Sequence, residues 1–477
     1  MMTPKNNLKE IQSDLRSGEY SMSMLMSSYL ELAKQNASLN IYLELYEAEA
    51  KTQAEQIDQK LKNGDTLGIL FGCVISVKDV ISHKDHGLSA ASKILEGYKS
   101  PYNATAIERL LTEDAIIIGR TNCDEFGMGS ANENSIYGPT KNGIDPERVP
   151  GGSSGAAAVS VQMNTCLIAL GSDTGGSVRQ PASFCGVFGL KPTYGRISRY
   201  GLIAYASSFD QIGILGHNPD DIGLVLEISA GKDPLDATSS SQAITSYNQS
   251  ESKSKPKIAY FPSLVEHEKL DESIKENVLR TIEQLKSTGA SVVAKDFEFA
   301  DYLVPTYYVL TTAEASTNLS RYDGVRYGHR SQSSETLEEM YVNSRTEGFG
   351  KEVKRRIMLG TYVLSEGYFD AYFTKAQQVR KLITEEMDKV LEDCDFLILP
   401  TSTSLPWKIG EMGEDPVAVY LSDMYTVLAN LTGLPAISVP SGNNSKGLPF
   451  GIQLMSKKYS EYELLSISKS INFTTSK

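Results

Sequence analysis

The sequence predicts an α/β fold, because helical patterns alternate with short buried strands along the chain. Residues 68–81, GILFGCVISVKDVI, form an apolar, β-branched run that is typical of a buried strand. A helical stretch then leads to the strand AIII, which ends at Gly119. Further on, the small-residue helix AAAVSVQM precedes the strand TCLIALG. Helices should therefore pack in layers against a sheet.

The N-terminal stretch and a polar segment in the middle of the chain suggest how it is divided into a helical cover, a catalytic domain and a loop. Residues 7–62 place apolar side chains three and four positions apart among charges, as amphipathic helices do. We predict that residues 1–62 form a helical cover on one large catalytic domain, residues 63–470. The Ser-rich stretch 236–256 is expected to be a surface loop or linker. Beyond it the alternation resumes with the strand KIAYF, a helix capped by Asp271, and the strand SVVAKDF.

Composition narrows the functional classes. The 477 residues are 40% hydrophobic and 22% charged, which suits an ordinary globular protein. A net charge of -13 repels phosphates, so this chain is not expected to bind nucleic acid by itself. The five scattered cysteines form no C-x-x-C pair, which argues against a disulfide framework or a zinc site. With no signal-peptide pattern and no long apolar stretch, we predict a cytoplasmic protein that does not enter a membrane.

The segment GGSSG, residues 151–155, matches the G-x-S-x-G pattern of a nucleophile elbow with Ser153 as nucleophile. An elbow directly follows a strand, but the preceding NGIDPERVP has two prolines and no apolar alternation. The histidines downstream stand in polar settings without a distinctive motif. The α/β-hydrolase interpretation is therefore disfavoured.

Two other interpretations of GGSSG stay open when the segment is taken alone. Its backbone amides could bind a phosphate at a helix N-terminus, although neither G-x-x-x-x-G-K-[ST] nor a G-x-G-x-x-G after a strand occurs. It could also be a tight turn before a closely packed helix, which is the favoured interpretation of the isolated segment.

A second loop adds to this picture. GSDTGGSVRQPA, residues 171–182, again places glycines directly before a serine, Ser177, after a buried strand. Lys78 stands at the end of the first strand, and Ser153 lies in GGSSG. The set of Lys78, Ser153 and Ser177 resembles the amidase signature family.

This resemblance extends over residues 65–455, and the glycine- and serine-rich block 148–216 is its most specific part. It implies the amidase signature fold, a mixed central β-sheet covered by helices on both faces. One departure is Ala156, where the family usually has a glycine. That methyl group leaves the three catalytic side chains in place.

The resemblance implies acyl transfer by a Ser-Ser-Lys triad. Ser177 would be the nucleophile, Lys78 the neutral base, and Ser153 the proton relay, with a cis peptide bond before Ser153. A serine hydroxyl needs such a base, and burial lowers the pKa of a lysine. No metal is required. The oxyanion hole would be formed by the backbone N–H groups of Thr174, Gly175, Gly176 and Ser177.

Further motifs resemble one branch of the family, the glutamine-hydrolysing subunits of tRNA-dependent amidotransferases. They are EASTNLSRYDGVRYG, RTEGFGKEVKRRIMLGTYVLS and ANLTGLPAISVP. The resemblance implies that Arg356 clamps the substrate α-carboxylate, Asp423 holds the α-ammonium and Tyr307 packs on the substrate. Simpler explanations remain open for each: Arg356 could pair with Glu352 on a helix surface, Asp423 could be solvated, and Tyr307 could be structural.

The same branch implies a multi-subunit enzyme. A B subunit would bind ATP, magnesium and the mischarged tRNA, and a small C subunit would brace the two larger chains. The acceptor would be Glu-tRNA(Gln), with Asp-tRNA(Asn) as the alternative, and no cofactor is expected in this chain. Two other functions are weighed against this one: a stand-alone amidase for small carboxamides, and a non-enzymatic scaffold, which the intact triad disfavours.

Overall fold

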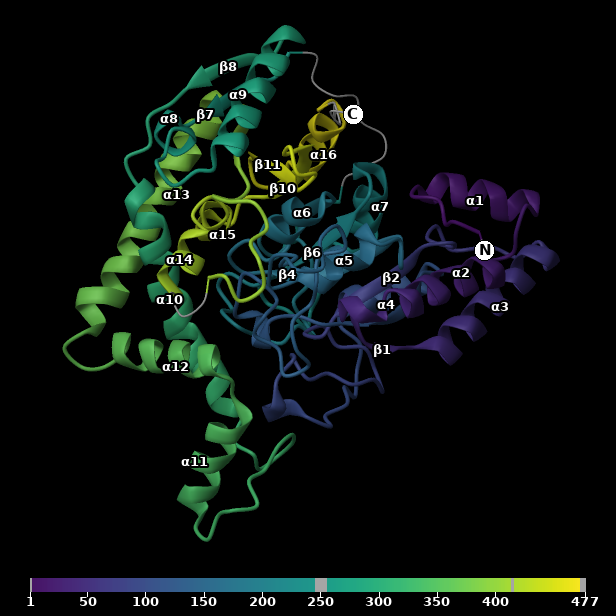
Figure 1. Ribbon diagram of the computed structural model, residues 1–477, viewed down its shortest axis with the longest axis horizontal. Coiled ribbons are helices and arrows are strands. Elements are labelled where there is room, and N and C mark those ends of the chain that lie inside the picture. Colours follow the sequence, from purple (N-terminus) through teal and green to yellow (C-terminus); the bar gives the residue numbers. More distant parts are fainter. Residues whose placement is uncertain (1, 245–254, 413–415, 472–477) are drawn as a thin grey trace.

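The computed structural model describes residues 2–244, 255–412 and 416–471. Within them the strands form one mixed sheet of eleven, in the order β1-β3-β2-β4-β6-β5-β10-β11-β9-β7-β8 (Figure 1). The strands are β1 (Tyr42–Leu45), β2 (Val74–Lys78), β3 (Ile116–Thr121), β4 (Ile168–Asp173), β5 (Phe188–Lys191), β6 (Gln211–Gly216), β7 (Lys257–Tyr260), β8 (Ser291–Ala294), β9 (Phe396–Pro400), β10 (Ala436–Asn443) and β11 (Pro449–Ser456).

Helices pack along the whole sheet, so the predicted α/β class is confirmed (Figure 1). Helices α1 to α3 lie at the β1 end, and α8 and α9 lie at the β8 end. The helices are α1 (Leu8–Ser17), α2 (Met22–Gln35), α3 (Glu47–Asn63), α4 (Thr105–Thr112), α5 (Gly155–Gln162), α6 (Arg179–Cys185), α7 (Pro219–Ser229), α8 (Pro262–Val265), α9 (Glu272–Ser287), α10 (Leu303–Asn318), α11 (Leu337–Gly348), α12 (Lys351–Val363), α13 (Lys375–Asp393), α14 (Pro416–Leu421), α15 (Val427–Thr432) and α16 (Glu461–Lys469).

The central strands bring two distant loops to one edge of the sheet. β2 pairs in parallel with β4, and Val77 lies opposite Leu170. Because parallel strands point the same way, Lys78 at the end of β2 lies beside the chain that leaves β4 at Asp173. Both strands are buried along their entire length. The lysine is therefore fixed by the sheet, next to the loop that carries Ser177.

Two short, buried helices pack against the sheet near this edge, and small side chains allow the first of them, α5, to approach closely. Residues 155–161 of α5 are all buried, and the helix packs on β2 and β4. The run GAAAVSV allows this close approach because it carries few side-chain atoms. Helix α6 starts two residues after Ser177, is likewise fully buried, and packs on α5, β5, β10 and β11.

The N-terminal region differs from its prediction in one respect. Helices α1, α2 and α3 are present, but Tyr42–Leu45 forms the edge strand β1, antiparallel to β3. A four-residue strand with one neighbour has too short a pattern to be recognised from alternation. One buried apolar cluster extends from Leu8 to Ile471, which is what packing of these helices on a single large domain requires. The division at residue 62 stays a prediction.

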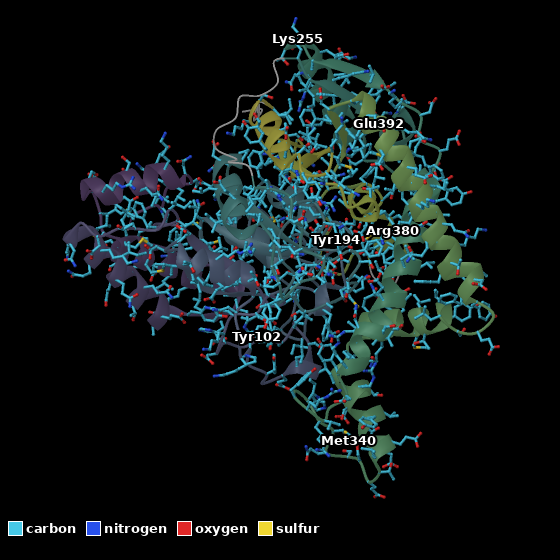
Figure 2. The ribbon with its side chains drawn as sticks, turned by 180° about the vertical axis from the view of Figure 1, so that it is seen from behind. Tyr102, Tyr194, Lys255, Met340, Arg380 and Glu392 are labelled. Atoms are coloured by element: carbon cyan, nitrogen blue, oxygen red, sulfur yellow. The ribbon has the colours of Figure 1, made fainter. Side chains whose placement is uncertain are left out.

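Two peripheral features complete the fold. Of the predicted loop 236–256, residues 245–254 lie outside the described residues, and residues 236–244 form turns and coil. Helix α11 projects from the body of the molecule (Figure 1). In Figure 2, Met340 on α11 and Lys255 lie at opposite ends of the molecule. None of the described helices has the length and apolar character that crossing a membrane would need.

Candidate active site

Lys78 is at the centre of a cluster of serines. Its side chain is fully buried, and Nζ lies 2.6 Å from Oγ of Ser153. Nζ also lies 2.9 Å from Oγ of Ser154 and 2.9 Å from Oγ of Ser172. All three partners are neutral hydroxyls. The lysine therefore contacts only groups that tolerate an uncharged amine, as a general base requires.

Burial lowers the pKa of Lys78 to about 8, and the nearby carboxylates of Asp124, Asp173 and Asp210 act in the opposite direction. Removing an ammonium group from water disfavours its charged form. Lys78 therefore loses its proton at a much lower pH than an exposed lysine, and near pH 8 about half of it is the free amine.

Ser153 precedes α5, and the backbone just before it, at Gly152, leaves no room for a side chain. The peptide bond between Gly152 and Ser153 is cis, as the family resemblance implies. A Cβ on Gly152 would lie 2.2 Å from Oδ2 of Asp124 and 2.5 Å from the backbone N of Ala131. Ser154 N–H donates to the carbonyl oxygen of Ser177 at 3.0 Å. This bond ties the two serine-bearing loops together.

Ser177 lies at the mouth of this cluster with 9% of its surface exposed. In the described part of the chain, its hydroxyl makes no hydrogen bond, and none joins it to Oγ of Ser153. The structure therefore brings Ser153 directly onto Lys78 and ties Ser177 to Ser154 through the backbone. The hydroxyl of Ser177 is left available to a substrate.

An internal ion pair shapes the loop between β4 and α6. Asp173 accepts from Gly176 N–H at 2.9 Å and from Val178 N–H at 3.1 Å, and Arg179 pairs with it at 2.9 Å. Burial alone would raise the pKa of Asp173, but Arg179 outweighs it and holds the pKa at about 2. Because the carboxylate of Asp173 already accepts from Gly176 N–H, one of the four N–H groups expected to form the oxyanion hole is not free to bind an oxyanion in this conformation.

The N–H groups of Thr174, Gly175 and Ser177 have no acceptor within the residues that the structure describes. Both glycines of this loop are enclosed. A Cβ on Gly175 would lie 2.3 Å from Oη of Tyr307, and one on Gly176, at φ +130°, would lie 2.2 Å from Oγ1 of Thr426. The loop therefore packs directly against the Tyr307 hydroxyl and Thr426, and neither Gly175 nor Gly176 could be replaced by a larger residue without a clash.

Arg356, on α12, is surrounded by the aromatic rings of other segments. It is only 3% exposed, and its Nε donates to Oε1 of Glu352 at 2.8 Å. Nη1 donates to Oη of Tyr205 at 2.8 Å. Its guanidinium carbon lies 5.3 to 5.6 Å from the ring centres of Tyr205, Tyr308 and Tyr420. The pair with Glu352 exists, but the alternative that it lies on a helix surface is wrong, since Arg356 is buried.

Asp423 lies between α14 and α15 and is 8% exposed, so the solvated alternative is also wrong. It accepts from Oγ of Ser130 at 2.9 Å and from Oη of Tyr308 at 2.9 Å. Burial raises the pKa of Asp423 to about 6, against the effect of these two hydroxyls. Tyr307 is buried too and meets the ring of Phe209 edge-on at 5.9 Å.

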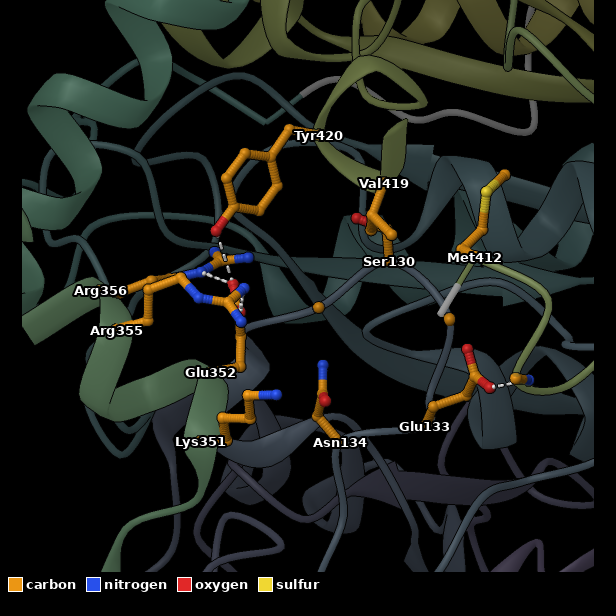
Figure 3. Close-up of a pocket in the computed structure, with 13 residues that line it drawn as sticks. Ser130, Glu133, Asn134, Lys351, Glu352, Arg355, Arg356, Met412, Val419 and Tyr420 are labelled. Atoms are coloured by element: carbon orange, nitrogen blue, oxygen red, sulfur yellow. Dashed lines mark hydrogen bonds and ion pairs between the residues drawn. The ribbon is translucent and has the colours of Figure 1, made fainter. Parts of the chain in front are cut away.

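A polar cavity of about 210 Å³ opens on the Arg356 side of the site (Figure 3). Figure 3 shows Arg355 and Arg356 directed to Glu352, with Tyr420 beside them. Neither Lys78 nor Ser177 lines this cavity. Its lining residues are Gly129, Ser130, Ala131, Glu133, Asn134, Lys351, Glu352, Arg355, Arg356, Gly410, Met412, Val419 and Tyr420.

The sequence did not reveal four polar side chains of this site: Ser130, Ser172, Tyr205 and Tyr308. Ser172 stands inside the recognised loop GSDTGGS, so its position was a usable signal. Ser130 follows DEFGMG, another polar glycine-bearing segment next to a strand. The two tyrosines have no local signal, because their partners come from distant segments.

Residues 24–465 match the family model described as Amidase. The chain is 50% identical over 466 residues to the A subunit of the glutamyl-tRNA(Gln) amidotransferase of Chlorobium phaeobacteroides, covering 97% of this chain and 98% of the relative. The crystal structure of the corresponding A subunit from Thermotoga maritima matches with a TM-score of 0.81 at 37% identity, over 98% of this chain and 94% of that one.

A native peptide amidase from Stenotrophomonas maltophilia has the same architecture, with a TM-score of 0.81 at 25% identity over 98% of this chain and 99% of that one. The resemblance drawn from the lysine- and serine-bearing loops is therefore confirmed over nearly the whole length. The chain belongs to the amidase family, whose signature enzymes share this mixed α/β sheet.

Proposed function

We propose that this chain is the glutamine-hydrolysing subunit of a tRNA-dependent amidotransferase. The observation that carries the proposal is the buried contact between Lys78 and Ser153 beside the Ser177 loop. Arg356 and Asp423 supply a buried guanidinium and a buried carboxylate, and both contact Tyr308. The relatives that match at about half identity are named as A subunits of such an enzyme.

The chemistry begins at the serine cluster. Lys78, as the free amine, takes the hydroxyl proton of Ser153 while Ser153 takes that of Ser177. Oγ of Ser177 attacks the carboxamide carbon, and the backbone N–H groups of Thr174, Gly175 and Ser177 stabilise the oxygen that becomes negative. The proton returns to the leaving nitrogen, and ammonia departs. Water then attacks the acyl-enzyme by the same relay, releasing glutamate and restoring Ser177.

Selectivity for glutamine follows from the two buried charges. A guanidinium carries five N–H donors, and Arg356 directs one to Glu352 and one to Tyr205. The remaining donors suit an α-carboxylate, which an arginine fork can bind with two parallel bonds. Asp423 accepts two hydroxyls and retains lone pairs for an α-ammonium. Tyr307, above Gly175, closes the site near the carboxamide.

Ammonia would then pass to a partner. The proposed B subunit binds ATP, magnesium and the mischarged tRNA, and the C subunit braces the assembly. Glu-tRNA(Gln) is the proposed acceptor, with Asp-tRNA(Asn) as the alternative. The chain's net charge of -13 supports this division of labour, because a strongly acidic chain attracts tRNA phosphates poorly.

Co-expression with its partners tests this function. The chain is purified alone and as the complex, and glutamate release is measured with and without mischarged tRNA and ATP. We expect low release by the isolated chain and a rise of about tenfold or more when all components are present, because the coupling would otherwise lose ammonia to water. The Ser177→Ala complex is the control and should stay inactive. Full activity of the isolated chain without tRNA would instead indicate a stand-alone amidase.

A further inference from the structure

One loop, Tyr205–Asp210, contacts both halves of the site. At its start, Oη of Tyr205 accepts from Nη1 of Arg356. Near its end, the ring of Phe209 packs edge-on against Tyr307, the tyrosine that covers Gly175. The loop therefore lies between the guanidinium proposed to bind the substrate carboxylate and the backbone proposed to bind the oxyanion.

Asp210 closes this loop and links it to the oxyanion side. Its Oδ2 accepts from the backbone N–H of Tyr205 at 2.9 Å and of Ala206 at 3.0 Å. Its Oδ1 accepts from Oγ1 of Thr174 at 2.7 Å. One carboxylate thus fixes the backbone that carries Tyr205 against the first residue of the oxyanion loop.

The outer side of the Tyr205–Asp210 loop is held by helices. Asn318 on α10 donates to the carbonyl oxygen of Tyr205 at 3.2 Å, and Glu314 accepts from Ser208 N–H at 2.9 Å. Arg380 on α13 lies 4.2 Å from the ring centre of Phe209. These contacts fix the loop to the scaffold, and Asp210 joins the fixed loop to Thr174.

Asp210 is costly to bury. It is 3% exposed, and the three groups that donate to it, the Thr174 hydroxyl and the N–H groups of Tyr205 and Ala206, are neutral. A buried carboxylate that has only neutral donors carries a large desolvation penalty. An asparagine has a single acceptor oxygen, so in this arrangement it could not accept from Thr174 on one side and from the two backbone N–H groups on the other. A carboxylate, by contrast, can accept all three bonds at once, because it has no donor to misplace.

We propose that Asp210 is a positioning residue that holds the oxyanion loop in register with the loop carrying Tyr205, and so with Arg356. The inference rests on the proposed function, because it assigns the oxyanion to residues 174–177. In this role Asp210 touches no substrate atom. It acts through Thr174 on one side and through the backbone of Tyr205 and Ala206 on the other.

The role has a pH signature. Burial raises the pKa of Asp210 to about 6, while its three donors and the charge of Arg199 oppose that rise. The charge of Asp210 in turn acts to raise the pKa of Lys78 and that of Tyr194. Protonation of Asp210 removes an acceptor from the Tyr205–Asp210 loop. Since Lys78 alone reduces turnover below about pH 8, a second protonation should steepen the fall below about pH 6.

The test compares Asp210→Asn, Thr174→Val and Thr174→Ser in the full complex. We expect Asp210→Asn and Thr174→Val each to lower kcat about 30-fold, with KM changed less than about threefold, because small displacements at a reacting centre are costly. Thr174→Ser keeps the hydroxyl and should retain kcat within about threefold. The double variant should be little worse than Asp210→Asn alone, since both substitutions disrupt the contact between Thr174 and Asp210.

The pH profile of kcat at saturating glutamine separates Asp210 from Asp423, whose pKa is also about 6 and whose proposed role is to bind substrate. In the wild type, the logarithm of kcat should fall with a slope of about two between about pH 6 and pH 5, and in Asp210→Asn the slope should stay about one over that range. A slope of two in Asp210→Asn, or a Thr174→Ser variant as slow as Thr174→Val, would overturn the proposal.

A second readout does not depend on glutamine. The rate at which a fluorophosphonate labels Ser177 reports the nucleophile, its base relay and the oxyanion loop, without the groups proposed to bind the α-charges of glutamine. It should fall in Asp210→Asn and Thr174→Val, and recover in Thr174→Ser. If the wild-type complex is labelled but releases no glutamate, the proposed function fails. The labelling rates of the variants still test the role of Asp210 in that case. Unchanged labelling in Asp210→Asn, with thermal unfolding like that of the wild type, contradicts the positioning role.

Discussion

Replacing Lys78 by methionine is expected to lower kcat/KM for glutamine by about 10³-fold or more, because the substitution removes the general base. Methionine fills the buried space at the end of β2 with an apolar chain of similar length, so the loss reports chemistry and not a cavity. Glutamate release by the purified complex provides the measurement. In the wild type, activity should fall about tenfold per pH unit below about pH 8, as the amine of Lys78 becomes protonated and ceases to be a base.

Lys191 on β5 offers a matched control. It is also fully buried, and burial lowers its pKa to about 7. Its Nζ donates to the carbonyl oxygen of Pro192 and to no serine in the described chain. Lys191→Met should retain activity within about threefold, because the proposed relay does not pass through it. If both variants lose activity equally, burial of a lysine, and not its contact with Ser153, would explain the effect.

Replacing Arg356 by methionine should reduce kcat/KM for glutamine about 100-fold, mainly through KM, because a charge-assisted contact with the substrate carboxylate is lost. Hydrolysis of a simple carboxamide without α-charges should change less than about threefold. Steady-state kinetics on both substrates provide the measurement. Equal losses on the two substrates would mean that Arg356 acts structurally, through its pair with Glu352.

Arg355 is the control on the same helix. It pairs with the same carboxylate, Glu352, and it also lines the cavity, but its side chain is 33% exposed. Arg355→Met should raise KM less than about threefold, because a solvent-screened arginine contributes little. A rise as large as that in Arg356→Met would move the carboxylate site from Arg356 to its neighbour.

The parts of the site that follow from local sequence were predictable. Lys78 ends a five-residue buried strand, and Ser177 follows a second one, so the alternation of helix and strand placed both at strand ends. Parallel pairing of β2 and β4 then brings the two ends together. The small residues of α5 likewise predicted a closely packed helix after Ser153.

What could not be predicted depends on contacts between distant segments. Ser130 and Asp423 are 293 positions apart, and no local pattern joins them. Burial of Arg356 results from three tyrosines on separate elements, so the helix pattern alone suggested a surface pair with Glu352. The engagement of Gly176 N–H by Asp173 also required the folded loop. The roles of residues that depend on long-range contacts can be assigned only from the folded structure.

The claim that Ser177 forms the acyl bond is tested most directly by trapping it. The complex is incubated with a glutamine analogue that bears a reactive acyl group, and the adduct is located by peptide mass spectrometry. The wild type should carry one adduct, on the peptide with Ser177, and the Ser177→Ala complex should carry none. An adduct on Ser153 with Ser177 unmodified would contradict the assignment of the nucleophile and of the relay built on it.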